Sequence, residues 1–245
     1  MRLTESPVAE PAAATGLGRS LYALVAYFGL MSIFGALLFG FRYAPGAPAA
    51  NIWFNVAIYA AFMAPHLIMT RSGWKRLVTG NPAGTPRERQ FYILLTLACW
   101  FAVIVLHRPT PGPELVVPSV VRFCGIVTFL MAFFLFFHGI TMGMIDGLLG
   151  VPGAVQGYSH GTDTPLFTGG AYAQVRHPMY RAAVLAGLAS LFIYPNAGQL
   201  LWVGLVGGTF IGFIPVEERQ MIAARGGDYL QYRAKTRWRL FRGIW

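Results

Sequence analysis

Charged residues are scarce in this 245-residue chain: they make up 11% of it, while 56% of it is hydrophobic. Soluble domains carry about a quarter charged residues, so one water-soluble core would not cover this much apolar surface. Acidic residues are rarer than basic ones: there are nine Asp and Glu and nineteen Lys and Arg, which gives a net charge of +10. The basic residues lie between apolar runs and near the C-terminus, as in membrane proteins. The composition therefore predicts a polytopic membrane protein and argues against nucleic acid as a partner.

Cysteine is also rare, with only Cys99 and Cys124 present. Both lie inside apolar runs, where a small buried side chain is their expected role. There is no disulfide framework and no CxxC motif, and we expect no metal site. Residues 1–18 are rich in Ala and Pro and lack the continuous apolar core of a cleavable signal peptide. We therefore expect a flexible tail at 1–18 and a single integral membrane domain at 19–245.

Long apolar runs dominate the rest of the chain, and several approach the roughly 20 residues that cross a bilayer. The runs cover residues 21–41, 52–69, 91–106, 120–144, 182–194 and 200–215. The fifth run is short for a full crossing, so we interpret the last two as a hairpin turning at Tyr194-Pro195-Asn196. The basic, aromatic stretch 235–245 suits a helix at the headgroup level. We predict an all-α, polytopic membrane helix bundle of five to six membrane helices, ending in a helical hairpin and a C-terminal interfacial helix.

Positive charge indicates the topology. Most Lys and Arg residues fall in the segment 71–89 and after residue 217, and few lie between the other runs. Cytoplasmic segments carry this excess, so we expect an integral protein of the bacterial inner membrane with both termini in the cytoplasm. The loop before residue 180 then faces the cytoplasm as well, and the polar motifs gather on one side.

The first polar cluster precedes the hairpin. His177 stands before Pro178, which keeps His177 out of the helical region and suits the first turn of the next helix. A helix entrance favours an anionic group such as a carboxylate, and Arg176 adds a planar pair of donors for it. Tyr172 and Tyr180 offer ring faces or hydroxyls. Each residue alone would be an interfacial anchor, but their grouping indicates a binding site.

The second polar cluster is Glu217-Glu218, which follows the hairpin. Two neighbouring carboxylates at the end of a membrane helix are costly unless they are solvated or paired. Arg176 or Arg181 could reach them, which would leave only a solvated ion pair. Alternatively, one carboxylate accepts hydrogen bonds from the hydroxyls or the amine of a ligand.

These two clusters carry a resemblance to a known family. The stretches LFTGGAY at 166–172 and VRHPMY at 175–180 resemble the cofactor motif of the isoprenylcysteine carboxyl methyltransferase family. Glu217-Glu218 and the later Gly226, Asp228-Tyr229 and Tyr232 recur at that family's spacing. The likeness covers about the last third of the chain. The segment 65–76 looks like the corresponding stretch of the methanethiol S-methyltransferase and NnrU-like branch.

The resemblance implies S-adenosylmethionine as the methyl donor, bound by residues 151–245 in a pocket closed by the C-terminal helix. Residues 19–150 would shape the acceptor site. Carried over by position, the cofactor contacts come from Thr164, Pro165, Leu166, Phe167, Tyr172, His177, Pro178, Met179, Tyr180 and Glu217. The polarity of the two clusters adds Arg176 and Glu218 to this set.

One departure from the family bears on the acceptor. Carboxyl-methylating members carry an arginine four residues before the acid that matches Glu217, where this chain has Phe213. With no cation there to orient a carboxylate, we expect a small, methanethiol-like thiol that becomes a thioether. A thiol reacts as its thiolate and needs a base. The candidates are His66, His138 and Asp146, with His66 preferred because it resembles a histidine of the thiol-methylating branch.

Other functions stay open. A phospholipid or isoprenylcysteine methyltransferase would use the same cofactor, a sterol-reductase-like enzyme would use NADPH, and a non-enzymatic membrane protein would bind neither. We expect a small or lipid-soluble acceptor and membrane lipids as partners. The sequence leaves the acceptor's identity and the oligomeric state undetermined.

Overall fold

The computed structural model describes residues 16–39, 41–82, 84–140, 149, 151 and 166–245, and the regular secondary structure within them is helical, with two isolated bridges between loops. Its elements are α1 Gly16–Phe39, α2 Ala50–Met69, α3 Ser72–Thr79, α4 Pro86–Leu106, α5 Ser119–Ile140, the 3₁₀ turn η1 Gly170–Ala173, α7 Pro178–Ile193, α8 Ala197–Arg225 and α9 Gly227–Lys235. Five of them, α1, α2, α4, α5 and α8, are long and apolar enough to cross a membrane. The predicted fold class, a polytopic helical membrane bundle, is confirmed.

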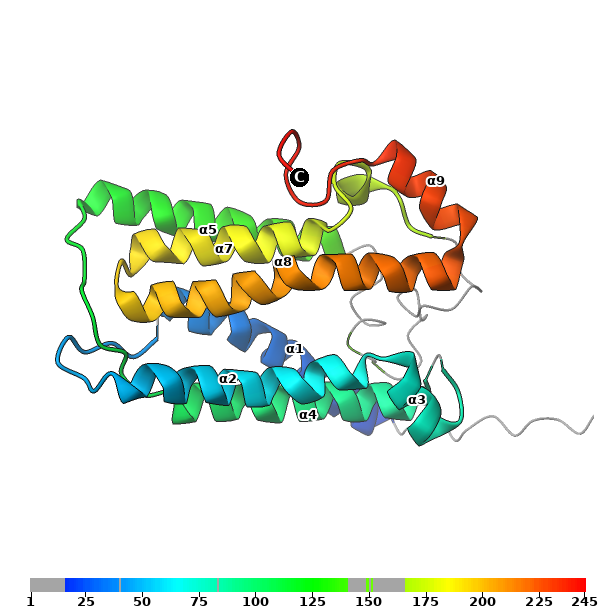
Figure 1. The fold of residues 1–245 in the computed structure, drawn as a ribbon, viewed down its shortest axis with the longest axis horizontal. Helices are drawn as coiled ribbons and strands as arrows, with labels where there is room; N and C mark the ends of the chain where they lie inside the picture. The colour runs from blue at the N-terminus through cyan, green and yellow to red at the C-terminus, as the bar shows by residue number, and fades with distance from the viewer. Residues whose placement is uncertain (1–15, 40, 83, 141–148, 150, 152–165) are drawn as a thin grey trace, which may run out of the picture.

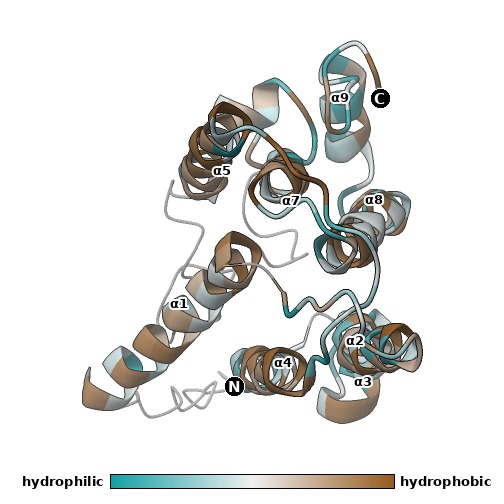
Figure 2. Cartoon of the chain, turned by 90° about the vertical axis from the view of Figure 1, so that its left-hand side faces the viewer, coloured by the Kyte–Doolittle hydropathy of each residue, from teal (hydrophilic) through white to brown (hydrophobic). Residues whose placement is uncertain are grey.

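The long helices form two groups that run along a common direction (Figure 1). One group is α5, α7 and α8, with α7 packed against both of the others, and the second is the pair α2 and α4. In the end-on view α1 lies beside these groups and contacts both α4 and α7 (Figure 2). Segment α3, segment α9 and the start of α7 lie at the same end of the bundle (Figure 1).

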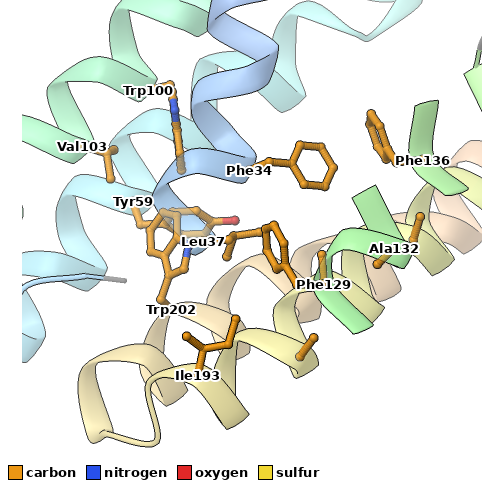
Figure 3. Packing of buried hydrophobic residues seen from close by; sticks show 13 residues of the cluster. Phe34, Leu37, Tyr59, Trp100, Val103, Phe129, Ala132, Phe136, Ile193 and Trp202 are labelled. Atoms are coloured by element: carbon orange, nitrogen blue, oxygen red, sulfur yellow. The ribbon is translucent and has the colours of Figure 1, made fainter. Parts of the chain in front are cut away.

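Aromatic side chains join the two groups in the main hydrophobic core (Figure 3). Phe34 of α1 meets Phe129 of α5 edge-on, with ring centroids 6.3 Å apart. Trp202 of α8 lies 5.3 Å from Trp100 of α4. Such pairs add to the gain from burying the rings themselves. The core therefore fixes the α7–α8 hairpin against the helices that precede it.

Helix α7 is the inner helix of the bundle. Its 16 residues extend for about 24 Å, short of the roughly 30 Å of bilayer hydrocarbon. Small residues such as Ala182, Ala186 and Ala189 are buried along it. Gly125 of α5 lets that helix come close, because a Cβ there would lie 2.9 Å from the Cβ of Phe192. Small residues at such contacts are typical of membrane helix packing.

The loops at the opposite end of the bundle are bonded to one another. Isolated bridges join Tyr43 to Thr110 and Glu114 to Asn196. The buried Asn55 of α2 donates from Nδ2 to Thr110 Oγ1 at 3.2 Å. Three connections that are distant in sequence thus form one hydrogen-bonded layer, which satisfies their polar groups where helices end.

Three expectations about the last and the middle segments need correction. Helix α8 does not end near Pro215 but continues for 29 residues to Arg225, with that proline inside it. A helix over 235–245 is wrong, because α9 ends at Lys235 and residues 236–245 follow as turns. In this tail the backbone N–H groups of Arg239 and Leu240 donate to the carbonyl of Trp245, which is not a helical pattern. The basic segment 71–89, which lies between two apolar runs and for which the sequence predicts no helix, contains α3.

Candidate functional site

The entrance of α7 is held by the C-terminal tail. Pro178 is the first residue of α7, and His177 before it has non-helical angles, φ −125° and ψ 64°, as expected for a residue that precedes proline. The backbone N–H of Arg176 donates to the carbonyl of Trp238 at 2.9 Å, and that of His177 donates to the carbonyl of Arg239 at 2.9 Å. Residues far apart in sequence therefore fix the start of the helix.

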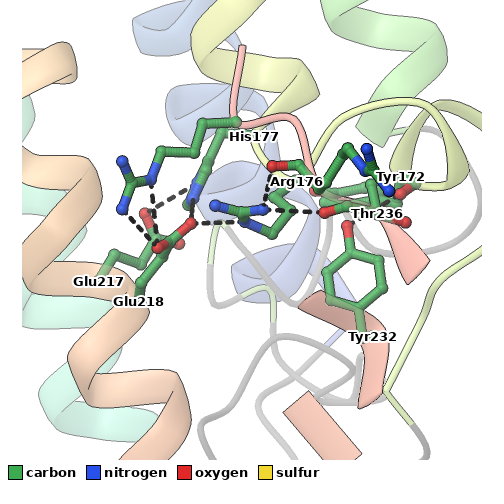
Figure 4. A network of polar contacts seen from close by, with 9 residues as sticks. Tyr172, Arg176, His177, Glu217, Glu218, Tyr232 and Thr236 are labelled. Carbon is green, nitrogen blue, oxygen red and sulfur yellow. Dashed lines mark hydrogen bonds and ion pairs between the residues drawn. The ribbon is translucent and has the colours of Figure 1, made fainter. Parts of the chain in front are cut away.

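Glu218 of α8 is the centre of a buried ionic cluster (Figure 4). Nε of Arg176 donates to its Oε1 at 2.6 Å, and Nε2 of His177 lies 3.3 Å from the same oxygen. Arg239 donates from Nε and Nη2 to Oε2 at 3.3 Å. The side chains of Arg176 and Glu218 are only 5% and 4% exposed. Both carboxylate oxygens of Glu218 are thus occupied by groups of the protein.

Arg176 also binds the tail directly. Its Nη1 donates to the carbonyls of Thr236 at 2.9 Å and Arg237 at 2.6 Å. A guanidinium that is shared between a carboxylate and two carbonyls has few donors left for another molecule. In this arrangement Arg176 and Glu218 join α7, α8 and the tail, and their roles as direct cofactor contacts stay predictions.

Glu217, the preceding residue of α8, is in a different environment. Its Oε2 lies 3.8 Å from Nδ1 of His177, beyond hydrogen-bonding distance, and is buried without a hydrogen-bond partner among the described residues. The ring of Tyr180 stacks on His177 at 5.5 Å and contacts Phe210 at 5.0 Å, and its hydroxyl interacts with the Glu217 carboxylate without meeting the geometric criteria for a hydrogen bond to Oε2. A buried acceptor without a donor is costly. The side chain is 24% exposed, so a ligand can reach it.

Aromatic residues around η1 form the neighbouring part of the site. The Tyr172 hydroxyl donates to Sδ of Met179 at 3.6 Å, and Phe167 meets the Tyr172 ring edge-on at 5.8 Å. Tyr232 of α9 donates from its hydroxyl to the carbonyl of Tyr172 at 2.9 Å. Burial raises the pKa of Tyr232 above its usual range, so the hydroxyl keeps its proton and remains a donor. Phe167 is 39% exposed and presents its ring at the surface.

His66 lies in the last turn of α2 and faces α4. The Tyr92 hydroxyl lies 3.0 Å from Nδ1 and 3.2 Å from Nε2 of His66, and Thr96 Oγ1 lies 3.3 Å from Nδ1. Tyr92 is also near enough to Tyr180 to act on it electrostatically. The α2–α4 pair therefore presents a polar group towards the hairpin. The sequence analysis identified His66 but missed Tyr92.

The other predicted residues are placed less centrally. His138 is exposed in α5 and stacks on Phe134 at 5.8 Å. Leu166 lies half-buried in the segment before η1. Asp146, Thr164 and Pro165 fall outside the described residues. Within the part of the chain that the structure describes, no group of His, Cys, Asp or Glu could hold a metal ion.

Sequence reasoning also missed Arg239. The tail is rich in arginine, and its charge was assigned to lipid headgroups. The sequence did contain a signal, because it has only nine acidic residues for nineteen Lys and Arg residues. A buried carboxylate in such a chain is expected to pair with more than one of these cations.

Comparison with known proteins finds one distant relative. The chain is 27% identical over 199 residues to Methanethiol S-methyltransferase 1 of Bradyrhizobium diazoefficiens, across 77% of this chain. The match spans 66% of that protein, just under two thirds of its length. No family model matches the chain, and no solved structure matches it. The similarity relates this helical membrane protein, at a distance, to a protein named as a methyltransferase.

Proposed function

We propose that this chain is an integral membrane methyltransferase that uses S-adenosylmethionine to methylate a small thiol. The observation that carries the proposal is the carboxylate oxygen Oε2 of Glu217, which is buried beside His177 and Tyr180 without a hydrogen-bond partner among the described residues. Its neighbour Glu218 is fully occupied, so the two adjacent acids have different tasks. The name of the distant relative supports the reaction class.

The described residues fit S-adenosylmethionine. Its ammonium group and ribose hydroxyls are donors, and no described residue donates a hydrogen bond to Glu217 Oε2. Its carboxylate suits the positive end of α7, where His177 is located. The rings of Tyr172 and Phe167 suit adenine or the sulfonium cation. When bound, the cofactor supplies a methyl group on a sulfonium, which transfers to a thiolate sulfur.

The chain's own contribution is to deprotonate and position the acceptor. His66 takes the thiol proton, with Tyr92 and Thr96 orienting its ring through the contacts at 3.0–3.3 Å. The aromatic core that lies next to it excludes water, which favours the displacement. Holding the methyl donor and the thiol in one fixed geometry supplies most of the remaining rate acceleration.

The acceptor class follows from Phe213. This residue lies in α8 one turn before Glu217 and is half-buried. No cation stands there to bind a carboxylate, so a neutral thiol is the acceptor that fits this position.

We further propose that the end of the bundle with α3, α9 and the α7 entrance faces the cytoplasm of a bacterial cell. The basic segments 71–89 and 219–245 gather at this end (Figure 1). This orientation obeys the positive-inside rule and opens the site to a cytoplasmic cofactor.

The test is to incubate purified protein with methyl-labelled S-adenosylmethionine and a panel of small thiols, prenylcysteine analogues and phospholipids. We expect label in a volatile thioether only. Calorimetric titration with S-adenosylmethionine and with NADPH runs in parallel. Binding of NADPH alone would indicate a reductase, and binding of neither would reject the enzyme assignment. Label in a lipid or a prenylcysteine would retain the cofactor and reject the thiol.

A further inference from the structure

A groove lies between the end of α2 and α3, and none of its lining residues is used by the proposed function. Its volume is about 330 Å³, and its lining residues are Leu67, Ile68, Arg71, Gly73, Trp74 and Leu77. It belongs to the segment 65–76, which the sequence analysis singled out. The proposed function uses only His66 from that segment. The remaining residues therefore need another explanation.

The groove has an apolar part and a polar part. Ile68 and Leu77 are 53% and 80% exposed, which is costly in water. Arg71, the residue before α3, is exposed at the rim. Trp74 of α3 lines the groove and is half-buried. A ligand that suits the groove needs an apolar portion and an acceptor, preferably an anion.

The groove lies at the end of a candidate membrane span. Helix α2 is a candidate membrane span that ends at Met69, so the groove begins where the hydrocarbon ends. The following helix α3 carries Lys75 and the exposed Arg76 together with the exposed Leu77 and Val78. Cations next to exposed apolar residues are characteristic of helices that lie in the headgroup region.

We propose that the α2–α3 groove binds one acidic phospholipid. Headgroup phosphate oxygens accept from the Arg71 guanidinium, and an acyl chain lies along Ile68 and Leu77 beside the half-buried Trp74. The positive charge of Arg71 and the neighbouring Arg76 complements the headgroup. This lipid site is independent of the proposed methyl transfer, since it shares no residue with it.

The fluorescence of Trp74 can report whether a lipid occupies the groove. The full-length protein is placed in nanodiscs containing phosphatidylcholine with increasing fractions of phosphatidylglycerol whose acyl chains are brominated, which quenches nearby tryptophan. The Trp74 signal is the difference between wild type and Trp74→Phe. We expect it to be quenched at a lower fraction of brominated phosphatidylglycerol than of brominated phosphatidylcholine. In Arg71→Gln we expect this preference to fall about fivefold, the effect of one cation near a membrane surface.

The matched control is Arg87→Gln, which removes an exposed arginine of the same basic segment that does not line the groove. We expect Arg87→Gln and Arg71→Lys to keep the preference. Equal quenching by the two lipids in wild type would overturn the proposal without need of any variant. An equal loss in Arg87→Gln and Arg71→Gln would also overturn it, because the attraction would then be diffuse. Displacement of the brominated lipid by soluble glycerol phosphate would assign the groove to a free phosphate instead.

Discussion

Replacing each of the two adjacent acids by glutamine tests the division of tasks between them. Glu218→Gln removes the charge that Arg176 meets at 2.6 Å, where both side chains are at most 5% exposed. Removing one partner of a buried pair costs about 3–5 kcal/mol, because the other charge stays buried. At about 2–4 °C per kcal/mol for a chain of this size, the unfolding temperature should fall by roughly 6–20 °C.

Glu217→Gln should behave in the opposite way. Its Oε2 has no hydrogen-bond partner among the described residues and only a 3.8 Å ionic contact with His177, so the unfolding temperature should stay close to that of wild type. The affinity for S-adenosylmethionine should fall, because hydrogen bonds to charged groups contribute about 1.5–3 kcal/mol, or about 10- to 100-fold.

Both variants are measured in the same detergent by thermal unfolding, followed by tryptophan fluorescence, and by calorimetric titration well below the transition. The two substitutions are chemically identical and one residue apart, so each is the control for the other. Equal unfolding temperatures for the two variants would refute the role of Glu218 as the centre of the ionic cluster. Unchanged cofactor affinity in Glu217→Gln would refute the pocket.

Three further predictions follow from other parts of the molecule. Gly125→Val should destabilise the protein by about 1–3 kcal/mol, because its Cβ would lie 2.9 Å from Phe192 Cβ, whereas Gly204→Val has open space and serves as the control in thermal unfolding. Burial, and then the charge of a nearby arginine, lowers the pKa of His107 to about 4. The unfolded chain takes up this proton near pH 6.5, so the free energy of unfolding should fall as the pH is lowered from about 6.5 to 4. In His107→Gln this loss should be smaller, which unfolding at pH 7 and at pH 4.5 measures. His66→Ala should lose thiol methylation at neutral pH and regain part of it at raised pH, where the thiol ionises unaided; equal turnover across pH would remove His66 as the base.

The long helices could be predicted because each needs only a run of about 20 apolar residues, a local property. The end of α8 could not. Pro215 and the two acids look like a boundary in sequence, but a membrane helix tolerates proline when neighbouring groups satisfy the freed backbone. Helix α3 was missed because it has only eight residues, with Gly73 at its second position and Gly80 directly after it, which makes the segment resemble a loop.

The candidate site could be predicted as a neighbourhood but not in its assignments. That Arg176 and the acidic pair meet follows from a hairpin that brings its two ends together. Which acid is occupied depends on a rotation of about 100° between consecutive helical residues, and the sequence does not specify that rotation relative to α7. The tail bonds to the backbone N–H groups of residues 176 and 177. Since every residue except proline carries such a group, the sequence gives no indication of this contact.

The hydrogen-bonded layer of loops at the far end of the bundle has a consequence for access. There the loops are joined through Thr110 and Asn196, and Gln199 of α8 donates to Ser190 of α7 at 2.6 Å with both residues fully buried. A solute would have to break several such bonds to pass between the described helices at that end. Reactants and products of the proposed reaction are therefore expected to come and go from the opposite face or sideways through the bilayer. The described part of the bundle is in this sense closed at one end.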